Sequence, residues 1–365
     1  MEQSDLFQEK NLAEVGERYI KRRIIERLGR YPLILGSLLG GLGHDSGFVR
    51  AQLERDDVLL VNTDKSGPSK AFNLGLANGE CIGDFAVSHA VSDILASGGR
   101  PFAISVAMLL PGQTKVRLVD QIVAGIGAAC MNYEMNLAGG DTKKAESLSL
   151  IVTALGKAPE KNVLYRNAAQ VGDKLVVSGY LGSVLLGSII HKRSIAVHQS
   201  VLDVVNHSLI YQRPPYRLAL EMNSQRLASS CTDISDGLPA ACKNLVERNN
   251  LGVIIKEDSV PIHPSLKDVS ETLGISPIQL SMAGGDWRFL YSVSEQNLEK
   301  IWSISARSQT QLTVIGEVVE QEGIWLKVQN GSMRRISDIE HDSFISYEGG
   351  KSYFEYLSDP IEIFQ

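Results

Sequence analysis

The sequence has few cysteines and no long apolar run. Its four cysteines, Cys81, Cys130, Cys231 and Cys242, form neither a CxxC pair nor a Cys/His spacing typical of zinc. We interpret them as buried thiols in a reducing compartment. No stretch of about 18 apolar residues is present, so a transmembrane helix is not expected. The polar residues 1–10 do not form a secretory signal. Together these absences predict a cytoplasmic protein.

The chain also lacks a run of Lys or Arg. It has 36 Lys and Arg residues against 42 Asp and Glu residues, which gives a net charge of −6. Without a basic cluster, neither nucleic acid nor an anionic membrane is expected as the main partner. The composition is 44% hydrophobic and 21% charged over 365 residues. It is typical of a globular chain with roughly two domains.

The familiar nucleotide-binding loops are absent. The sequence contains no GxxxxGK[ST] loop, no GxGxxG between a strand and a helix, and no HRD/DFG pair. A GxSxG elbow is absent too, which argues against an α/β-hydrolase. Gly125 and Gly127 lie inside an apolar helical run, and we interpret them as a packing feature. If the chain binds ATP, metal ions must neutralise most of the phosphate charge.

Aspartates beside small residues are the most informative feature of the chain. They adjoin Gly, Ser or Thr, and glycine lets backbone approach a ligand closely. Carboxylate oxygens are hard ligands that hold Mg²⁺, which in turn holds polyphosphate. The pattern therefore predicts an ATP site built from carboxylate-bound metals. These residues are Asp45, Asp64, Asp93, Asp141, Asp233, Asp236 and Asp286.

Each aspartate also has a plainer interpretation. Asp64 could cap a turn after a strand, and Asp141 could be a helix N-cap. An N-cap explains one of Asp233 and Asp236 but not both. Asp93 is more informative, because an aspartate inside an apolar helix has poor propensity and is costly to bury unpaired.

Basic side chains near these aspartates are ambiguous on spacing alone. Arg166 could bridge phosphate oxygens, and a surface salt bridge explains it equally well. His44 could touch a phosphate, although an exposed loop histidine is commoner. His89 lies one turn before Asp93 and could pair with it, but we favour a place on the helix surface.

Apolar spacing predicts a mixture of strands and helices. In the first half we expect helices at 5–28, 82–97 and 115–130, a loop at 65–78, and strands at 58–61, 102–110, 136–138 and 148–155. Asp64 would follow the first of these strands, and Asp141 would follow the third. In the second half we expect strands at 174–178, 252–255, 289–293, 312–318 and 324–328, with helices at 181–190, 191–228 (broken at 213–215) and 236–247. Without regular βαβ alternation, the fold class is α+β.

Seven motifs occur in an order that resembles one known family. They are Gly-Leu-Gly-His-Asp-Ser-Gly-Phe-Val (41–49), Thr63-Asp64, and the runs 92–101, 139–142, 166–173, 179–183 and 233–238. The chain is similar to the family that joins aminoimidazole ribonucleotide synthetase, selenophosphate synthetase, the hydrogenase-maturation dehydratase and thiamine-monophosphate kinase. Within it, the chain most resembles the thiamine-monophosphate kinases. It lacks the N-terminal reactive cysteine and the terminal cysteine of two other branches.

The resemblance implies a two-domain, synthetase-like α+β fold. An N-terminal helical arm (1–30) would precede an ATP- and metal-binding domain (31–158), whose sheet pairs with a second copy in a shared barrel. A C-terminal, α/β sandwich-like domain (159–365) would complete the ATP and acceptor site. The implied cofactors are ATP and Mg²⁺. The implied partners are a small-molecule acceptor and a second copy of the chain, in a homodimer.

The resemblance also carries residue roles onto this sequence. Asp286 would orient the acceptor or accept its proton, and Asp141 and Asp236 would join it as catalytic residues. The implied nucleotide contacts are Gly140, Arg166 and Ser235. The implied metal ligands are Asp45, Thr63, Asp64, Asp93, Asp141, Asp233 and Asp236.

The chain departs from the family pattern mainly on the acceptor side. His44 stands where relatives usually carry an acid, and Ala71 replaces an expected substrate-loop histidine. The family's Gly-Gly-Glu-Asp-Tyr-Glu becomes two glycines followed by Asp286, Trp287 and Arg288. The arm and the residues beyond 336 have no clear match. The ATP half is therefore expected to be intact and the acceptor half rebuilt.

These observations predict a Mg²⁺-dependent ATP phosphotransferase that resembles thiamine-monophosphate kinase. It would transfer the γ-phosphate to a small acceptor. One alternative keeps ATP but activates an amide or carbonyl oxygen of a non-thiamine substrate, in a dehydratase, cyclase or synthetase reaction. A further alternative is a nucleotide-binding homologue without turnover.

Overall fold

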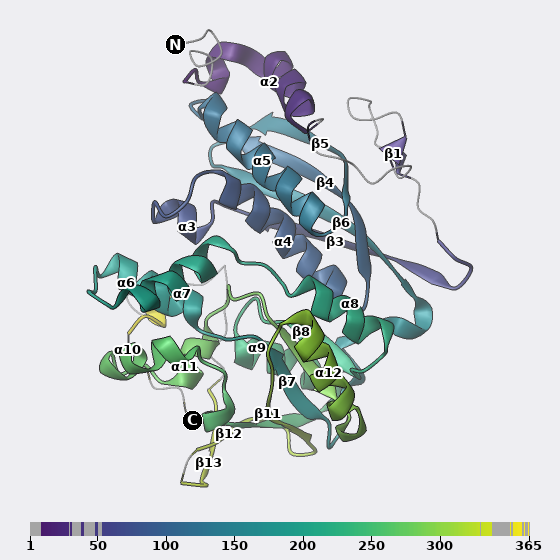
Figure 1. Ribbon diagram of the computed structural model, residues 1–365, viewed down its shortest axis with the longest axis vertical. Helices are drawn as coiled ribbons and strands as arrows, with labels where there is room; N and C mark the ends of the chain where they lie inside the picture. Colours follow the sequence, from purple (N-terminus) through teal and green to yellow (C-terminus); the bar gives the residue numbers. More distant parts are fainter. Residues whose placement is uncertain are drawn as a thin grey trace. The chain divides into compact units, whose positions relative to one another are not determined.

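The computed structural model (Figure 1) describes residues 9–28, 30, 38–39, 48–49, 53–328, 330–337, 351, 353–359, 361 and 364. Internal contacts divide the chain into two units. Unit 1 comprises Met1–Leu95 and Gly99–Lys161, and unit 2 comprises Ala96–Gly98 and Asn162–Gln365. Within the described ranges, no helix combines the length and the apolar character that crossing a membrane requires.

Unit 1 is built on a four-stranded sheet in the order β3-β6-β4-β5. β3 (Asp57–Ser66) is antiparallel to β6 (Ser149–Pro159), and β6 is antiparallel to β4 (Arg100–Leu110). β4 is parallel to β5 (Asn136–Lys144). A parallel pair needs a long crossover, and α5 (Val116–Asn132) provides it. A short antiparallel pair, β1 (Leu38–Leu39) and β2 (Phe48–Val49), precedes the sheet.

Two helices of unit 1 pack backbone to backbone over the sheet (Figure 1). A Cβ atom at Gly83 in α4 (Glu80–Ala96) would lie 2.1 Å from the carbonyl oxygen of Ile122 in α5. One at Gly125 would lie 1.9 Å from the carbonyl oxygen of Glu80. Only glycine fits such a contact, so the interpretation of Gly125 as a packing feature is confirmed. The core below includes the buried Ile82, Ile94, Leu95, Ile104, Ile122 and Leu150.

The N-terminal helix α2 (Leu12–Leu28) docks on α5 through a buried carboxylate. Arg23 Nε donates to Asp120 Oδ1 at 2.7 Å, and Arg27 donates to Asp120 Oδ2 at 2.9 Å. Burial by itself raises the pKa of Asp120, but the hydrogen bonds from Arg23 and Arg27 outweigh it and hold that pKa below its ordinary value. Asp120 is therefore ionised at neutral pH and anchors the arm.

Unit 2 contains a seven-stranded sheet in the order β13-β12-β9-β11-β7-β10-β8. β12 is parallel to β9, and the other neighbours are antiparallel. The inner strands β7 and β10 are almost wholly buried. The strands are β7 (Lys174–Ser178), β8 (Ser230–Asp233), β9 (Gly252–Lys256), β10 (Phe289–Val293), β11 (Leu312–Val319), β12 (Gly323–Lys327) and β13 (Met333–Arg335).

Helices of unit 2 pack against its sheet, and several of them share a large apolar cluster with the strands. The predicted break at 213–215 is confirmed, because it separates α7 from α8. The helices are α6 (Ser183–Lys192), α7 (Gln199–Ile210), α8 (Tyr216–Ser224), α9 (Leu238–Val246), α10 (Lys267–Thr272), α11 (Pro277–Met282), α12 (Leu298–Ser308) and α13 (Tyr353–Tyr356). Short 3₁₀ turns are η1 (Glu160–Asn162), η2 (Arg166–Ala168), η3 (Glu247–Asn249), η4 (Glu257–Ser259), η5 (Pro264–Leu266) and η6 (Glu295–Asn297).

Unit 1 differs from the sequence prediction in three segments. β3 pairs with β6 as far as Ser66, so Asp64 lies inside a strand rather than after one. β5 continues through its glycines to Lys144, so Asp141 also lies inside a strand. Pairing with a neighbour sets both strand ends, which propensity within one segment does not reveal. The segment predicted as a loop, 65–78, contains the short helix α3 (Lys70–Asn73), capped by Ser69.

We expect Asp120→Ala to loosen the arm. The change removes charge-assisted hydrogen bonds at a buried position, so it should cost about 1–3 kcal/mol of unfolding free energy. Hydrogen exchange in α2 should accelerate. Glu134→Ala is the matched control, because Glu134 pairs with Arg100 while its side chain is 58% exposed. That pair is worth less than about 1 kcal/mol. Equal losses in urea unfolding of the two variants would contradict the anchoring role of Asp120.

Candidate metal and nucleotide site

Asp64 lies on the face of β3 that packs against α4. Side chains alternate along a strand, so Asn62, Asp64 and Ser66 share this face. Asn62 Nδ2 donates to Asp64 Oδ2 at 2.5 Å and to the carbonyl oxygen of Ala90 in α4 at 3.4 Å. The strand and the helix together therefore fix the orientation of the Asp64 carboxylate.

His89 extends this cluster from α4. A hydrogen bond of 3.0 Å joins its Nδ1 to Ser66 Oγ, and its Nε2 lies 4.0 Å from Asp64 Oδ1. The interpretation of His89 as a helix-surface residue is therefore wrong. Its ring faces the strand, because the polar face of β3 gives it partners that the helix pattern alone does not reveal. Asp93 lies one turn further along the same helix and is half-buried.

Thr63 points to the opposite face of the sheet from Asp64. Its hydroxyl hydrogen-bonds to that of Thr153, directly across on β6, at 3.0 Å, and the pair is exposed. Neighbouring exposed side chains on this face include Leu59 at 50% and Val61 at 60% exposure. Within one chain, Thr63 and Asp64 thus face different surroundings. This face of β3 presents apolar side chains to solvent.

Gly140 and Asp141 lie on β5, at the other end of the sheet order. The register runs from Asp64 through Val152 and Val106 to Gly140. Three strand spacings of about 4.8 Å put these positions about 14 Å apart. A Cβ atom at Gly140 would lie 2.0 Å from the carbonyl oxygen of Val106, so strand pairing itself requires this glycine. Asp141 is exposed, and its Oδ1 accepts the N–H of the next residue at 2.8 Å.

The described residues of one chain contain no group of three or more His, Cys, Asp and Glu side chains arranged to hold a metal ion. Asp45 and His44 lie outside the described residues. Convergence of the predicted metal ligands on one ion therefore stays a prediction.

In unit 2, the loop between β8 and α9 carries three predicted site residues. Asp233 ends β8 and is buried, and Ser235 Oγ donates to its Oδ1 at 3.3 Å. Asp236 is exposed. Gly237 has φ +95° and directly precedes α9. The loop thus holds one carboxylate inward and presents another to solvent.

Two loops of unit 2 cross at glycines. A Cβ atom at Gly284 would lie 1.5 Å from the carbonyl oxygen of Ser235, and one at Gly237 would lie 1.8 Å from the carbonyl oxygen of Met282. Neither contact tolerates a side chain, because the opposing atoms are backbone. The β8–α9 loop and the α11–β10 loop (283–288) are therefore locked against each other.

Arg166 lies beside the β8–α9 loop. Ser230 Oγ donates to the carbonyl oxygens of Tyr165 and Arg166, at 2.9 Å and 2.8 Å. The turn η2 contacts both β8 and α9, the elements that flank the loop. The guanidinium group belongs to an exposed residue. Arg166, Asp233, Ser235 and Asp236 are thus brought together in one region of unit 2.

Asp286 caps a helix, a role that the sequence reasoning missed. Its Oδ2 accepts the N–H of Gly182 at 2.6 Å, and its Oδ1 accepts the N–H of Val184 at 3.1 Å. These groups begin α6, whose own N-cap position is a glycine without a side-chain acceptor. Helix starts leave such N–H groups without partners. The glycine at the N-cap position of α6 has no side chain to cap the helix, so the sequence could have indicated that a residue distant in sequence does so.

Burial has the largest effect on the pKa values of the charged side chains in the α11–β10 loop. It raises the pKa of Asp286 to about 6, although nearby Arg288 and the backbone N–H groups pull that pKa down. Burial also lowers the pKa of Arg288, whose Nη1 donates to the carbonyl oxygen of Arg213 at 3.3 Å. Trp287, between them, is buried with φ +49°. A left-handed backbone is costly for an aromatic residue and is typical of functional segments.

A cavity of about 740 Å³ also lies in unit 2. Its lining includes Glu257, Lys267, Glu271 and Arg334, with Phe364 on one side. None of the predicted site residues that the structure describes lines it.

Family comparisons match both halves of the chain. Residues 43–158 match the AIR synthase related protein, N-terminal domain, and residues 170–329 match the AIR synthase related protein, C-terminal domain. A thiamine-monophosphate kinase from Pyrococcus horikoshii is 26% identical over 291 residues, 78% of this chain and 85% of the relative. One from Aquifex aeolicus is 28% identical over 250 residues, 68% of this chain and 77% of the relative.

Solved structures share the fold. The crystal structure of thiamine-monophosphate kinase from Stenotrophomonas maltophilia has a TM-score of 0.72 at 24% identity, and the match covers 84% of this chain and 94% of that one. AaThiL complexed with AMPPCP and TMP has a TM-score of 0.66 at 24% identity, with coverage of 91% and 98%. The family resemblance and the two-domain α+β class are confirmed. Pairing of two copies in a barrel stays a prediction.

We expect the stability of the parent protein and of Asp286→Asn to diverge with pH. The raised pKa means that the folded protein keeps the Asp286 proton up to about pH 6, whereas the unfolded chain releases it near the ordinary value of 3.8. The parent should therefore lose stability relative to the variant as pH rises through this window, with no further change above it. Urea unfolding at a series of pH values measures the difference. A constant difference from pH 4 to pH 7 would contradict the raised pKa.

Proposed function

Because the chain belongs to the AIR synthase related protein family, we propose that it is a Mg²⁺-dependent ATP phosphotransferase of the thiamine-monophosphate kinase type. It transfers the γ-phosphate of ATP to thiamine phosphate. The observation that carries this proposal is the similarity to thiamine-monophosphate kinases over most of the chain. The domain limits inferred from the sequence, 31–158 and 159–365 after an arm at 1–30, belong to the same proposal.

The proposed phosphate-binding residues in unit 2 surround the β8–α9 loop. Asp233 and Asp236 are hard oxygen ligands suited to Mg²⁺, and the exposed side chain of Asp236 is open to a ligand. Arg166 pairs with phosphate oxygens, a role that suits a guanidinium held beside the loop. Ser235 contacts the nucleotide. Because Gly237 and Gly284 lock the loop, these groups are positioned before ATP binds.

The proposed residues in unit 1 are Asp64, Asp93 and Asp141 as metal ligands, together with Asp45 and Thr63. Their oxygen donors suit Mg²⁺. When bound, Mg²⁺ supplies positive charge that offsets the charge of the transferring phosphoryl group. Asn62 holds the Asp64 carboxylate in orientation, and His89 lies beside it. Gly140 lets the backbone approach the nucleotide.

Asp286 serves the acceptor side in this proposal. A phosphate acceptor is already ionised at neutral pH, so no proton acceptor is required of the protein. Both carboxylate oxygens of Asp286 accept backbone N–H groups. Its contribution to catalysis is therefore to fix the α11–β10 loop and so orient the acceptor, which supplies rate through placement.

The direct test combines the purified chain with ATP, Mg²⁺ and thiamine monophosphate. We expect ADP and thiamine diphosphate in equal amounts. ADP with free phosphate and a chemically altered acceptor would instead favour activation of an amide or carbonyl oxygen. Calorimetric binding of ATP without its consumption would favour a homologue that has lost turnover.

We expect Asp141→Asn and Asp236→Asn each to reduce Mg²⁺-dependent turnover by roughly 100-fold or more, because losing a metal ligand removes several kcal/mol of charge stabilisation. Both residues are exposed, so melting temperatures should stay close to that of the parent. Asp203→Asn is the control, since Asp203 is an exposed carboxylate on α7 that pairs only locally with Gln199. Undiminished kcat in either site variant would remove that residue from the site.

We also propose that the exposed face of β3 pairs with the same face of a second copy. Leu59 and Val61 present apolar area there that a partner would remove from water. Pairing would place the exposed Thr63 beside residues of the second copy. By the strand register, Asp141 shares this face and would also gain new neighbours, whereas Asp64 faces α4 on the other side of the sheet.

We expect Val61→Asp to shift the protein toward a monomer, because a charge in an apolar interface is costly to desolvate. Light scattering after size-exclusion chromatography measures the mass. Val171→Asp is the matched control, since Val171 is 52% exposed and belongs to unit 2, whereas this face belongs to unit 1. The same dimer mass for parent and Val61→Asp would rule out this interface.

A further inference from the structure

The C-terminal segment enters the core of unit 2 although it lies outside the family match. The match ends at residue 329, and the tail, which we define as residues 351 and 353–359, follows. Tyr353 is 4% exposed and Leu357 is fully buried. Both belong to the apolar core of unit 2. This chain therefore completes its core with a segment that lies beyond the residues matched by the family models.

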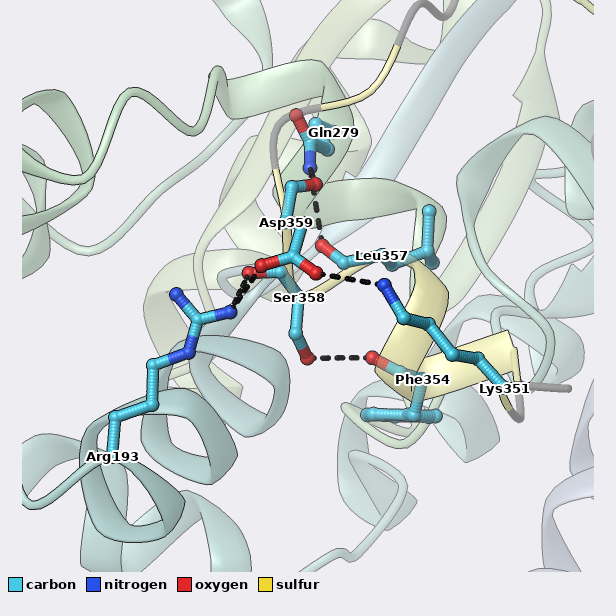
Figure 2. A network of polar contacts seen from close by, with 7 residues as sticks. All are labelled: Arg193, Gln279, Lys351, Phe354, Leu357, Ser358 and Asp359. Carbon is cyan, nitrogen blue, oxygen red and sulfur yellow. Dashed lines mark hydrogen bonds and ion pairs between the residues drawn. The ribbon is translucent and has the colours of Figure 1, made fainter. Parts of the chain in front are cut away.

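Asp359 is the centre of a polar network that joins the tail to two helices (Figure 2). Its carboxylate accepts hydrogen bonds from Arg193 at 2.5 Å and from Lys351 at 3.0 Å. These hydrogen bonds lower the pKa of Asp359, and the bond from Lys351 has the largest effect. The buried amide of Gln279 in α11 donates to the carbonyl oxygens of Leu357 at 3.1 Å and Asp359 at 2.6 Å. The tail is thereby fixed to the end of α6 and to α11.

Tyr353 reaches the crossing of the two loops. Its hydroxyl donates to the carbonyl oxygen of Met282 at 3.0 Å, and the bond is buried. That same carbonyl oxygen packs against Gly237. Met282 ends α11, so the next residues form the α11–β10 loop with Asp286 and Trp287. One hydroxyl of the tail therefore supports the backbone at the start of this loop.

Helix α6 connects the tail to the loop a second time. Asp286 caps its N-terminus, and Arg193 at its C-terminal end binds Ser358 and Asp359 of the tail. The contacts form a closed circuit through the tail, α6, the α11–β10 loop and α11. A closed circuit restrains each member more than a single contact would, because no segment moves without breaking a bond elsewhere.

We propose that Tyr353 and Asp359 are positioning residues that hold the α11–β10 loop in the conformation that binds the acceptor. The inference rests on the proposed phosphotransferase function. Trp287 keeps a costly φ of +49°, and such a backbone persists only where the surrounding structure over-determines it. The tail provides that restraint. Through the hydrogen bond to Met282, the tail thus contributes to placing the acceptor.

The test uses Tyr353→Phe and Asp359→Asn in the full-length chain. Tyr353→Phe keeps the buried ring and removes only the hydroxyl. Loss of one buried hydrogen bond corresponds to about a fivefold effect. We expect KM for thiamine monophosphate to rise by about this factor, with KM for ATP changed less than about twofold. Glu355→Gln is the control. Glu355 lies in the same tail and pairs with Lys192 of α6, but both side chains are about half exposed.

Hydrogen exchange of residues 282–288 gives a readout that does not depend on turnover. Faster exchange there in Tyr353→Phe and Asp359→Asn, but not in Glu355→Gln, supports the proposal. A lowered melting temperature with unchanged exchange and unchanged acceptor KM would reduce the tail to a structural role and overturn it. If the parent does not phosphorylate thiamine monophosphate, the proposed function fails. The exchange measurement then still decides whether the tail positions the loop.

Discussion

The crossing of two loops at Gly237 and Gly284 is the constraint on which the proposed site in unit 2 depends. Backbone lies against backbone there, with no space for a Cβ atom on either side. The contact fixes Ser235 and Asp236 relative to the segment that leads to Asp286. A polyphosphate site needs such rigidity, because the positions of its ligands are set before the phosphates arrive and little energy is spent on reorganisation.

Burial distinguishes aspartates that support the fold from exposed ones that are proposed to bind ligands. Asp120 and Asp286 lie inside the protein, and each is committed to hydrogen bonds that hold a helix. Asp141 and Asp236 are exposed, so their carboxylates are open to solvent. A carboxylate that already satisfies helix N–H groups has little capacity left for a cation, whereas an exposed one retains it. Among these four aspartates, burial accompanies a structural role and exposure accompanies the proposed ligand-binding role.

Local patterns in the sequence predicted much of this fold, and contacts distant in sequence account for the rest. The helix that carries Asp93 and the packing role of Gly125 could be predicted, because apolar periodicity and a glycine within a helix are visible in the local sequence. The place of Asp64 inside β3 depends on pairing with β6, some 90 residues away in the register. The His89 contacts and the cap by Asp286 also join distant segments. Motif order led to the proposed site residues, but it did not reveal which of them share a face.

The glycine contact between α4 and α5 makes the two helices behave as one body. At Gly83 and Gly125 the backbones of the two helices are in direct contact, so one helix cannot shift without moving the other. Asp93 and His89 are carried on α4, and the arm is anchored to α5 through Asp120. Homologous chains that replace one of these glycines must therefore separate the axes. We expect them to carry compensating changes where the arm docks, so that the two regions co-vary through evolution.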